Sequence, residues 1–350
     1  MTSRDSICIT AEPGVLTEGL FGGIFLSTFE ILPALDRCDV RPEWEISSLL
    51  YGNEPEYLVI PGILDLAYEA PSGPSKQLSL RNIRRKYNYA LGSDWRALRS
   101  LWGSYFKIPH RIEKRADEVS DLSKALGVHY RGQDKVTASW DTNPIGHDEF
   151  IAVVRDFLGR NRQFNKVYVA SDDATFIERI RSAVELEVLS LGEGRSHKVL
   201  EGQSGRFAEA ERAVLDCVLL SRCSAVLNTS SALSAFAKVL NPDLEIYRCA
   251  ASKMFADAPY FPIAYIPIYE SEDATVRNIL SKTLVDDWTF GRRAAVFAGQ
   301  FAFKRLPFGQ STEFANTGAA QVRRLLKALF LIFWPGLKVA PASTAGRRPG

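Results

Sequence analysis

The fold class is indicated by the stretch Lys166-Val167-Tyr168-Val169-Ala170-Ser171-Asp172-Asp173. The residues from Val167 to Ala170 are β-branched, aromatic or small, a composition typical of a short strand buried on both faces. The strand ends in polar residues, and residues 174–184 then have the apolar spacing of a helix. A buried strand, a polar turn and a helix together form the building unit of an α/β protein with a parallel sheet.

The same unit recurs on both sides of this stretch. Further strands are predicted at residues 127–130, 187–190 and 225–228, and further helices at residues 148–158, 208–221 and 232–240. Nearer the start of the chain, the pattern predicts strands at residues 6–10 and 56–61, a glycine-rich loop at residues 17–23, and helices at residues 24–35 and 112–126. We therefore expect a doubly wound α/β protein, and 350 residues suffice for two domains.

Three of the predicted strands are followed by polar clusters. These clusters are Arg131 with Asp134 and Lys135, Asp172 with Asp173, and Thr229 with Ser230 and Ser231. In open parallel sheets, ligands bind beyond the carboxyl ends of the strands. If the three strands are neighbours, a guanidinium, an ammonium group and several hydroxyls converge on one crevice, which suits a diphosphate.

Each cluster also has a purely structural interpretation. Ser and Thr are common helix N-caps, and acids are favoured in the first turn of a helix, so residues 229–231 and Asp172-Asp173 would serve the helices that follow them. The two aspartates could instead hold a metal or accept hydrogen bonds from a ribose or a purine. The glycines of residues 17–23 suit either tight packing or the binding of an anion or a sugar.

The composition excludes several functional classes. With 24% charged residues and a net charge of +2, the chain is neither disordered nor a dedicated nucleic-acid binder. Residues 81–102, rich in Arg and aromatics, are accordingly interpreted as an amphipathic helical segment. Five cysteines without a CxxC pair and four scattered histidines indicate neither a disulfide framework nor a zinc site. Without a secretory signal or an apolar stretch of about 20 residues, we expect a cytoplasmic protein.

The C-terminal part is a separate electrostatic unit. Residues 291–350 contain ten Lys or Arg and a single acid, Glu313, so they carry +9 while residues 1–290 carry −7. Residues 323–334 combine three cations with a nearly continuous apolar run. One interpretation is a final helix that packs on the globular body. The other is peripheral contact of residues 306–350 with the inner face of a membrane, where the cations would attract anionic lipid.

Three motifs in the middle of the chain resemble the α1,6-fucosyltransferase family, which includes the rhizobial nodulation fucosyltransferase and its eukaryotic N-glycan relatives. The stretch Gly127-Val128-His129-Tyr130-Arg131-Gly132-Gln133-Asp134-Lys135 is similar to the family's His-x-Arg-Arg-x-Asp-Lys motif. The strand that ends in Asp172 and Asp173 is similar to the second motif. The third is a helix that bears Asp216, followed by the strand and turn of residues 225–231.

The resemblance implies a GT-B fold, in which two Rossmann-like doubly wound domains enclose a donor cleft. It implies inverting transfer of L-fucose from GDP-β-L-fucose to an acceptor such as an N-acetylglucosamine-containing oligosaccharide, free or lipid-linked, without a metal or other cofactor. It also implies that Arg131 binds the donor diphosphate. The other donor-binding positions that it implies are His129, Asp172, Asp173, Asp216, Thr229, Ser230 and Ser231. Asp134, Lys135 and Asp141 join Arg131 as candidate catalytic residues, and Gly22 and Gly23 form a candidate donor or acceptor loop.

Three departures from the family pattern bear on the mechanism. The second Arg of the first motif is Gly132 here, and the acid four residues after the motif's Lys, a candidate base, is Ser139. The Gln after the Ser-Ser pair is also absent. Asp134 and Asp141 remain candidates for the base. Two other functions stay open: a transferase in which Asp172 and Asp173 hold Mn²⁺, and a module that binds a GDP-sugar without turnover.

The expected domain organisation follows the motifs. Residues 1–125 are assigned to an acceptor-side α/β domain and residues 126–270 to a nucleotide-sugar-binding domain. Residues 271–305 are assigned to a helical return segment, and residues 306–350 to the basic apolar tail.

Overall fold

The structure is a computed structural model that describes residues 6–11, 20–21, 28, 31–48, 58–71, 75–79, 94–132, 145–192, 206–229, 231–250 and 266–283. The basic tail, the predicted loop positions Gly22 and Gly23, and residues 81–93 lie outside these ranges.

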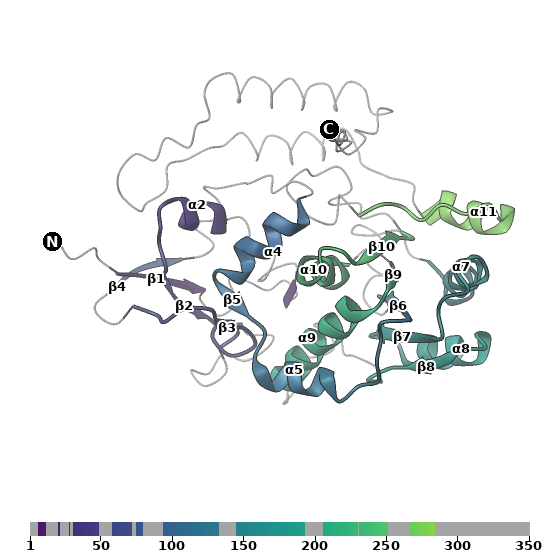
Figure 1. Ribbon diagram of the computed structural model, residues 1–350, viewed down its shortest axis with the longest axis horizontal. Helices are drawn as coiled ribbons and strands as arrows, with labels where there is room; N and C mark the ends of the chain where they lie inside the picture. The colour runs from purple at the N-terminus through teal and green to yellow at the C-terminus, as the bar shows by residue number, and fades with distance from the viewer. Residues whose placement is uncertain are drawn as a thin grey trace, which may run out of the picture.

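The larger sheet has five parallel strands in the order β10-β9-β6-β7-β8 (Figure 1). Its strands are β6 (Ala125–Tyr130), β7 (Lys166–Ser171), β8 (Glu187–Leu189), β9 (Ala225–Asn228) and β10 (Glu245–Arg248). β6 is central and buried along its whole length. Because β6 lies between β9 and β7, the polar segments that follow these three strands are neighbours at one edge of the sheet.

Helices cover both faces of this sheet, as the βα repeats predict. The helices α7 (His147–Arg160), α8 (Ala174–Ala183) and α11 (Ala274–Thr283) pack with the strands in one hydrophobic cluster. The helices α9 (Arg206–Arg222) and α10 (Ala232–Leu240) belong to the second cluster. Gly127 lets α9 approach β6, since a Cβ there would lie 2.8 Å from Val226 Cγ2 and 3.0 Å from Leu220 Cδ2.

A smaller parallel sheet forms the N-terminal part, with the order β2-β1-β4. Its strands are β1 (Ser6–Ala11), β2 (Glu43–Ile46) and β4 (Ser75–Ser79). The other elements here are the antiparallel pair β3 (Asp65–Leu66) and β5 (Phe106–Lys107), and the helices α2 (Leu32–Arg37), α4 (Trp95–Gly103) and α5 (His110–Asp117).

One continuous core joins the two sheets. It runs from Ile9 of β1 through α4 to α9 and α10, which Figure 1 shows between the sheets. At its centre the Trp102 and Phe236 rings meet edge to face with centroids 5.5 Å apart, and Phe21 packs on Phe236 at 5.7 Å. Phe21 belongs to the predicted glycine-rich loop, and its side chain lies against Phe236 of α10.

The expected α/β class is confirmed, because the five-stranded and three-stranded sheets are both parallel and helices pack against them, as a GT-B fold requires of its two units. The predicted strands and helices between residues 127 and 240 occur within three residues of their expected limits. The proposed domain boundaries stay a prediction.

Two predicted elements are wrong. Residues 58–63 form a turn instead of a strand, with only a single bridge between Ile60 and Ile46. The chain turns at Gly62, which has a φ of 148° and lies so close to the Leu58 carbonyl that a Cβ would come within 2.2 Å of its oxygen. The predicted helix 112–126 ends at Asp117, because Asp121 accepts from the Ser123 N–H in a turn and residues 125–126 pair with β7.

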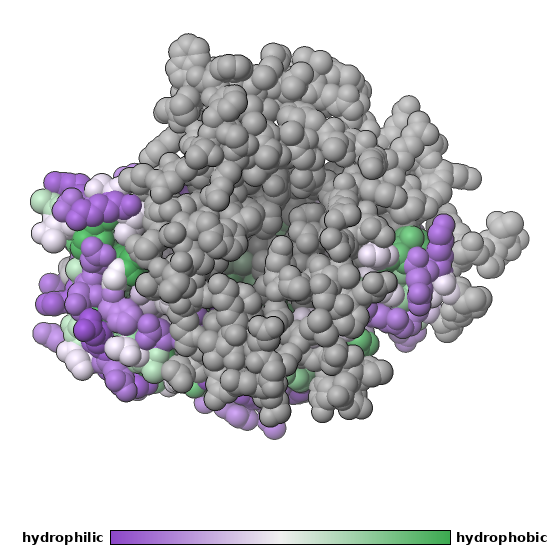
Figure 2. All heavy atoms as spheres, turned by 180° about the vertical axis from the view of Figure 1, so that it is seen from behind, coloured by the Kyte–Doolittle hydropathy of each residue, from purple (hydrophilic) through white to green (hydrophobic). Residues whose placement is uncertain are grey.

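The described surface seen in Figure 2 is largely hydrophilic, with small scattered apolar areas. Among the described residues, no helix combines the length and the apolar character needed to cross a bilayer.

Candidate functional site

The ends of β9, β6 and β7 meet at Arg131. Its backbone N–H donates to Thr229 Oγ1 at 2.9 Å, and the Thr229 N–H donates to the His129 carbonyl at 3.2 Å. On the other side, Arg131 Nε lies 3.2 Å from Asp172 Oδ2. The predicted convergence of the three strand ends is therefore present, and Arg131 is held from both neighbouring strands.

Asp172 orients Arg131 and the turn that follows it. The carboxylate is buried, at 7% exposure, whereas the Arg131 side chain is 23% exposed. Asp172 Oδ1 accepts a hydrogen bond from the Gly132 N–H at 2.8 Å, while Asp172 Oδ2 forms the ion pair with Arg131. A buried carboxylate needs a cation and hydrogen-bond donors. This ion pair therefore restrains Nε of the Arg131 guanidinium at the carboxyl end of the sheet.

Asp173 is the N-cap of α8. Its Oδ1 accepts from the Phe176 N–H at 3.1 Å, and its own N–H donates to Ser171 Oγ at 3.1 Å. Its Oδ2 lies 2.9 Å from Nε2 of His147, the first residue of α7. The capping interpretation therefore holds for Asp173, and the second oxygen forms an Asp–His pair.

Gly132 occupies a space that admits no side chain. A Cβ at this position would lie 2.8 Å from Tyr130 Cε1 and 2.9 Å from Asp173 Oδ2. Neither neighbour can easily move, since the Tyr130 ring stacks on Phe176 at 4.2 Å and Asp173 caps α8. The absence of the motif's second Arg therefore has a local steric reason.

His129 lies in β6 at 4% exposure, and no described residue forms a hydrogen bond to its buried Nδ1. Burial, reinforced by the charge of Arg131, lowers the pKa of this imidazole to about 3. His129 is therefore neutral at physiological pH, so one ring nitrogen donates and the other accepts.

The end of β9 leads directly into α10. Ser231 is the N-cap of this helix and accepts from the Leu233 N–H at 3.3 Å. The capping interpretation of this turn thus holds for Ser231, while the Thr229 hydroxyl is engaged by Arg131. The N-terminus of α10, which favours anions, lies at the same sheet edge as Arg131.

Asp216 lies apart from the strand ends. It is buried in α9 and accepts from the Tyr168 hydroxyl at 2.5 Å, and Tyr168 belongs to the middle of β7. Burial raises the pKa of Asp216 to about 6, against the opposing effects of the Tyr168 hydrogen bond and Arg212. The structure thus places this predicted donor-binding residue in a buried pair between α9 and the sheet.

The other predicted site residues lie outside the described part of the chain: Asp134, Lys135, Asp141, Ser230, Gly22 and Gly23. Their roles remain predictions, as does that of Ser139. Within the described ranges, no three His, Cys, Asp or Glu side chains are arranged to hold a metal ion.

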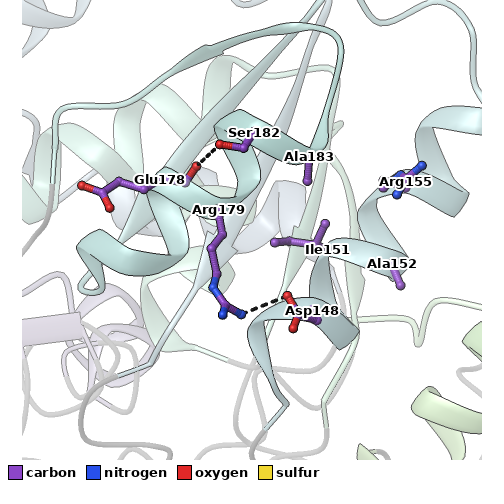
Figure 3. Close-up of a pocket in the computed structure, with 8 residues that line it drawn as sticks. All are labelled: Asp148, Ile151, Ala152, Arg155, Glu178, Arg179, Ser182 and Ala183. Carbon is purple, nitrogen blue, oxygen red and sulfur yellow. Dashed lines mark hydrogen bonds and ion pairs between the residues drawn. The ribbon is translucent and has the colours of Figure 1, made fainter.

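A groove of about 440 Å³ lies between α7 and α8 (Figure 3). Arg179 reaches across it to Asp148 at 2.9 Å, and Ile151 and Ala183 contribute apolar lining. Both helices pack on the face of the sheet opposite α9 and α10. None of its lining residues is a predicted site residue.

His147 is not among the site residues predicted from the sequence. It stands alone between a polar segment and an amphipathic helix, and a single histidine forms no recognisable spacing pattern. The available signal was its position immediately before the predicted helix 148–158, which follows the first motif.

No protein-family profile matches the chain, and no curated protein matches it in sequence. Among solved structures, the chain is similar to NodZ α-1,6-fucosyltransferase soaked with GDP-fucose, at 15% identity and a TM-score of 0.42, over 68% of this chain and 94% of that one. It is also similar to a variant of Arabidopsis thaliana FUT1 in complex with GDP, at 9% identity and a TM-score of 0.43, over 71% and 72% of the two chains. For POFUT1 in complex with GDP the identity is 14% and the TM-score 0.34, over 69% and 72%. These are similarities of fold.

Proposed function

We propose that this protein is a glycosyltransferase that transfers L-fucose with inversion from GDP-β-L-fucose to a sugar acceptor such as an N-acetylglucosamine-containing oligosaccharide. The observation that carries the proposal is the position of Arg131 at the junction of three strand ends. There the Thr229 hydroxyl holds its backbone and Asp172 holds its guanidinium. The motif that contains Arg131 is the part of the sequence that resembles the α1,6-fucosyltransferase family.

The first task of such an enzyme is to bind and stabilise the leaving diphosphate. Arg131 supplies a fixed cation with several N–H donors, and the N-terminus of α10 adds a dipole that favours anions. Neutral His129 adds a hydrogen-bonding group without adding charge. A preorganised cation of this kind stabilises the negative charge that develops on the diphosphate as the sugar departs. On this proposal no metal takes part.

The second task is to accept the proton of the attacking hydroxyl. Transfer with inversion needs one displacement: the acceptor oxygen bonds to the anomeric carbon while the bond to the phosphate oxygen breaks. A general base that removes the hydroxyl proton contributes about 10²–10⁴-fold to such reactions. Asp134 and Asp141 are the candidates from the sequence, and neither lies within the described residues.

A thermal-shift screen tests the donor class. We expect GDP and GDP-fucose to raise the melting temperature, because a ligand that binds only the folded state stabilises it, and UDP and ADP sugars to leave it unchanged. A UDP or ADP preference would contradict the proposed donor. Turnover that requires Mn²⁺ and is lost in EDTA would instead support the metal-dependent alternative. GDP binding without turnover would support a binding module.

A further inference from the structure

His147 and Asp173 form a pair whose geometry is that of a histidine oriented by a carboxylate. The distance from His147 Nε2 to Asp173 Oδ2 is 2.9 Å, and both side chains are 21% exposed. The imidazole packs edge to face against the stacked Tyr130 and Phe176 rings, with centroids 5.2 Å from Tyr130 at 78° and 5.7 Å from Phe176 at 63°. Asp173 is in turn fixed by its cap on α8. Both partners are therefore held in place by the fold.

The arrangement determines which ring nitrogen can act as a base. An ionised carboxylate only accepts hydrogen bonds, so Nε2 of His147 carries the proton that it shares with Asp173. Nδ1 is then the nitrogen with a free electron pair. If Nδ1 takes up a second proton, the adjacent Asp173 carboxylate stabilises the imidazolium that forms.

The pair lies next to the position where the chain departs from the family motif. Asp173 Oδ2 is 2.9 Å from His147 Nε2 and also 2.9 Å from the place of a Cβ on Gly132. Any side chain at position 132 would therefore displace the carboxylate oxygen that holds the histidine. The chain thus has Gly132 where the pair needs space, and Ser139 where the family has a candidate base.

We propose that His147 is the general base of the transfer reaction and that Asp173 is its positioning residue. This inference rests on the proposed function. The acceptor hydroxyl oxygen forms a bond to the anomeric carbon, and the bond from that carbon to the β-phosphate oxygen breaks with its electron pair passing to GDP. The hydroxyl proton passes to His147 Nδ1, and the resulting imidazolium later releases it to water.

The charged and titratable groups around His147 come from four elements. Asp173 lies at the start of α8, and the Tyr130 hydroxyl, whose pKa burial raises to about 12, donates to the Ile145 carbonyl at 3.0 Å. On its own helix, Glu149 accepts from the Gly146 N–H at 3.0 Å. Arg131 and Asp172, which follow β6 and β7, form an ion pair with each other. Asp173 is thus the acid that contacts the imidazole directly.

The test uses the full-length protein with GDP-fucose and an N-acetylglucosamine oligosaccharide, and it measures GDP release and GDP affinity separately. In His147→Gln the amide N–H can still reach Asp173, but no basic nitrogen remains, so we expect kcat to fall at least about 100-fold. The Kd for GDP should stay within about threefold of wild type. Asp173→Asn retains an oxygen for the α8 cap and should lower kcat with a shifted acidic limb of the pH–rate profile. His110→Gln is the matched control, because His110 is exposed at the first position of α5, and it should leave both values unchanged.

The outcomes separate this inference from the proposed function. If His147→Gln retains turnover within about threefold of wild type while GDP still binds, the assignment of the base is wrong and the proposed function stands. If Asp173→Asn leaves the pH–rate profile of the wild type unchanged, the positioning role is wrong. If the wild-type protein neither binds GDP nor releases it from GDP-fucose, the proposed function is overturned and this inference with it.

Discussion

Asp172 binds Arg131 and the residue after it with the same carboxylate. Oδ2 lies 3.2 Å from Arg131 Nε, and Oδ1 accepts the Gly132 N–H at 2.8 Å. The carboxylate follows the end of β7 and the cation follows the end of β6, so the pair joins two of the three strand ends that meet at the site. Asp172 therefore positions the cation through an ion pair that is largely shielded from water.

Arg131→Ala should abolish most of the affinity for GDP without unfolding the protein. Removing one partner of a charge-assisted hydrogen bond in a partly buried site costs about 2–5 kcal/mol, so Kd should rise at least about 30-fold. Isothermal titration with GDP measures this change. Arg162→Ala, which removes an exposed arginine beyond the end of α7, is the control and should bind as wild type does. A change of less than about threefold for Arg131→Ala would contradict the role of Arg131.

The contributions of Arg131 and Asp172 to GDP affinity should be strongly coupled. Asp172→Asn keeps an oxygen for the Gly132 N–H but removes the charge that orients the guanidinium. The two single variants and the double variant form a double-mutant cycle, from which we expect a coupling energy of about 1–2 kcal/mol. The effects of substituting residues in direct contact are typically non-additive. Additive effects, measured by the same titration, would mean that Asp172 does not act through Arg131.

Gly132→Ala should destabilise the protein, because the added Cβ would meet Tyr130 and Asp173 at less than 3 Å. Overpacking of this kind costs about 1–3 kcal/mol in the free energy of unfolding. The matched control is Gly159→Ala in α7, where no atom lies within 4 Å of the new Cβ. That substitution should be neutral or stabilise by up to about 1 kcal/mol. Urea unfolding compares the two, and equal stabilities would show that position 132 has room for a side chain.

Asp216→Asn should remove a pH dependence of stability. Burial raises the pKa of Asp216 to about 6, above its ordinary value of 3.8, so the folded state binds more protons between these values. The free energy of unfolding of the wild type therefore falls as the pH rises from about 4 to about 6. The asparagine variant keeps an acceptor for the Tyr168 hydroxyl but buries no charge. The difference in free energy of unfolding between this variant and the wild type should therefore shift in favour of the variant by on the order of 2 kcal/mol from pH 4 to pH 7. A stability difference that is constant over this range would contradict the raised pKa.

The sequence patterns were most informative where burial and helix periodicity agree. From residue 127 to 240 they predicted every strand and helix of the βα repeats, including β9 and α10 with their observed bounds. They were less informative in the N-terminal part. There β2 and β4 were not identified and the strand 56–61 was wrong. β4 is mainly polar, and β2 alternates polar and apolar over only four residues, so neither is a continuous apolar run.

The sequence by itself determined the α/β class, the repeated strand–turn–helix units and the polar residues at the strand ends, because these depend on interactions between residues close together in the chain. Only the tertiary structure decided that β6 lies between β7 and β9, which brings Arg131 to Asp172 and Thr229 across 41 and 98 positions of sequence. It also decided the pairing of His147 with Asp173 and the space that excludes a side chain at Gly132. Interactions of this kind depend on which strands lie side by side, and that is set by the packing of the whole core, because local periodicity carries no information about strand order.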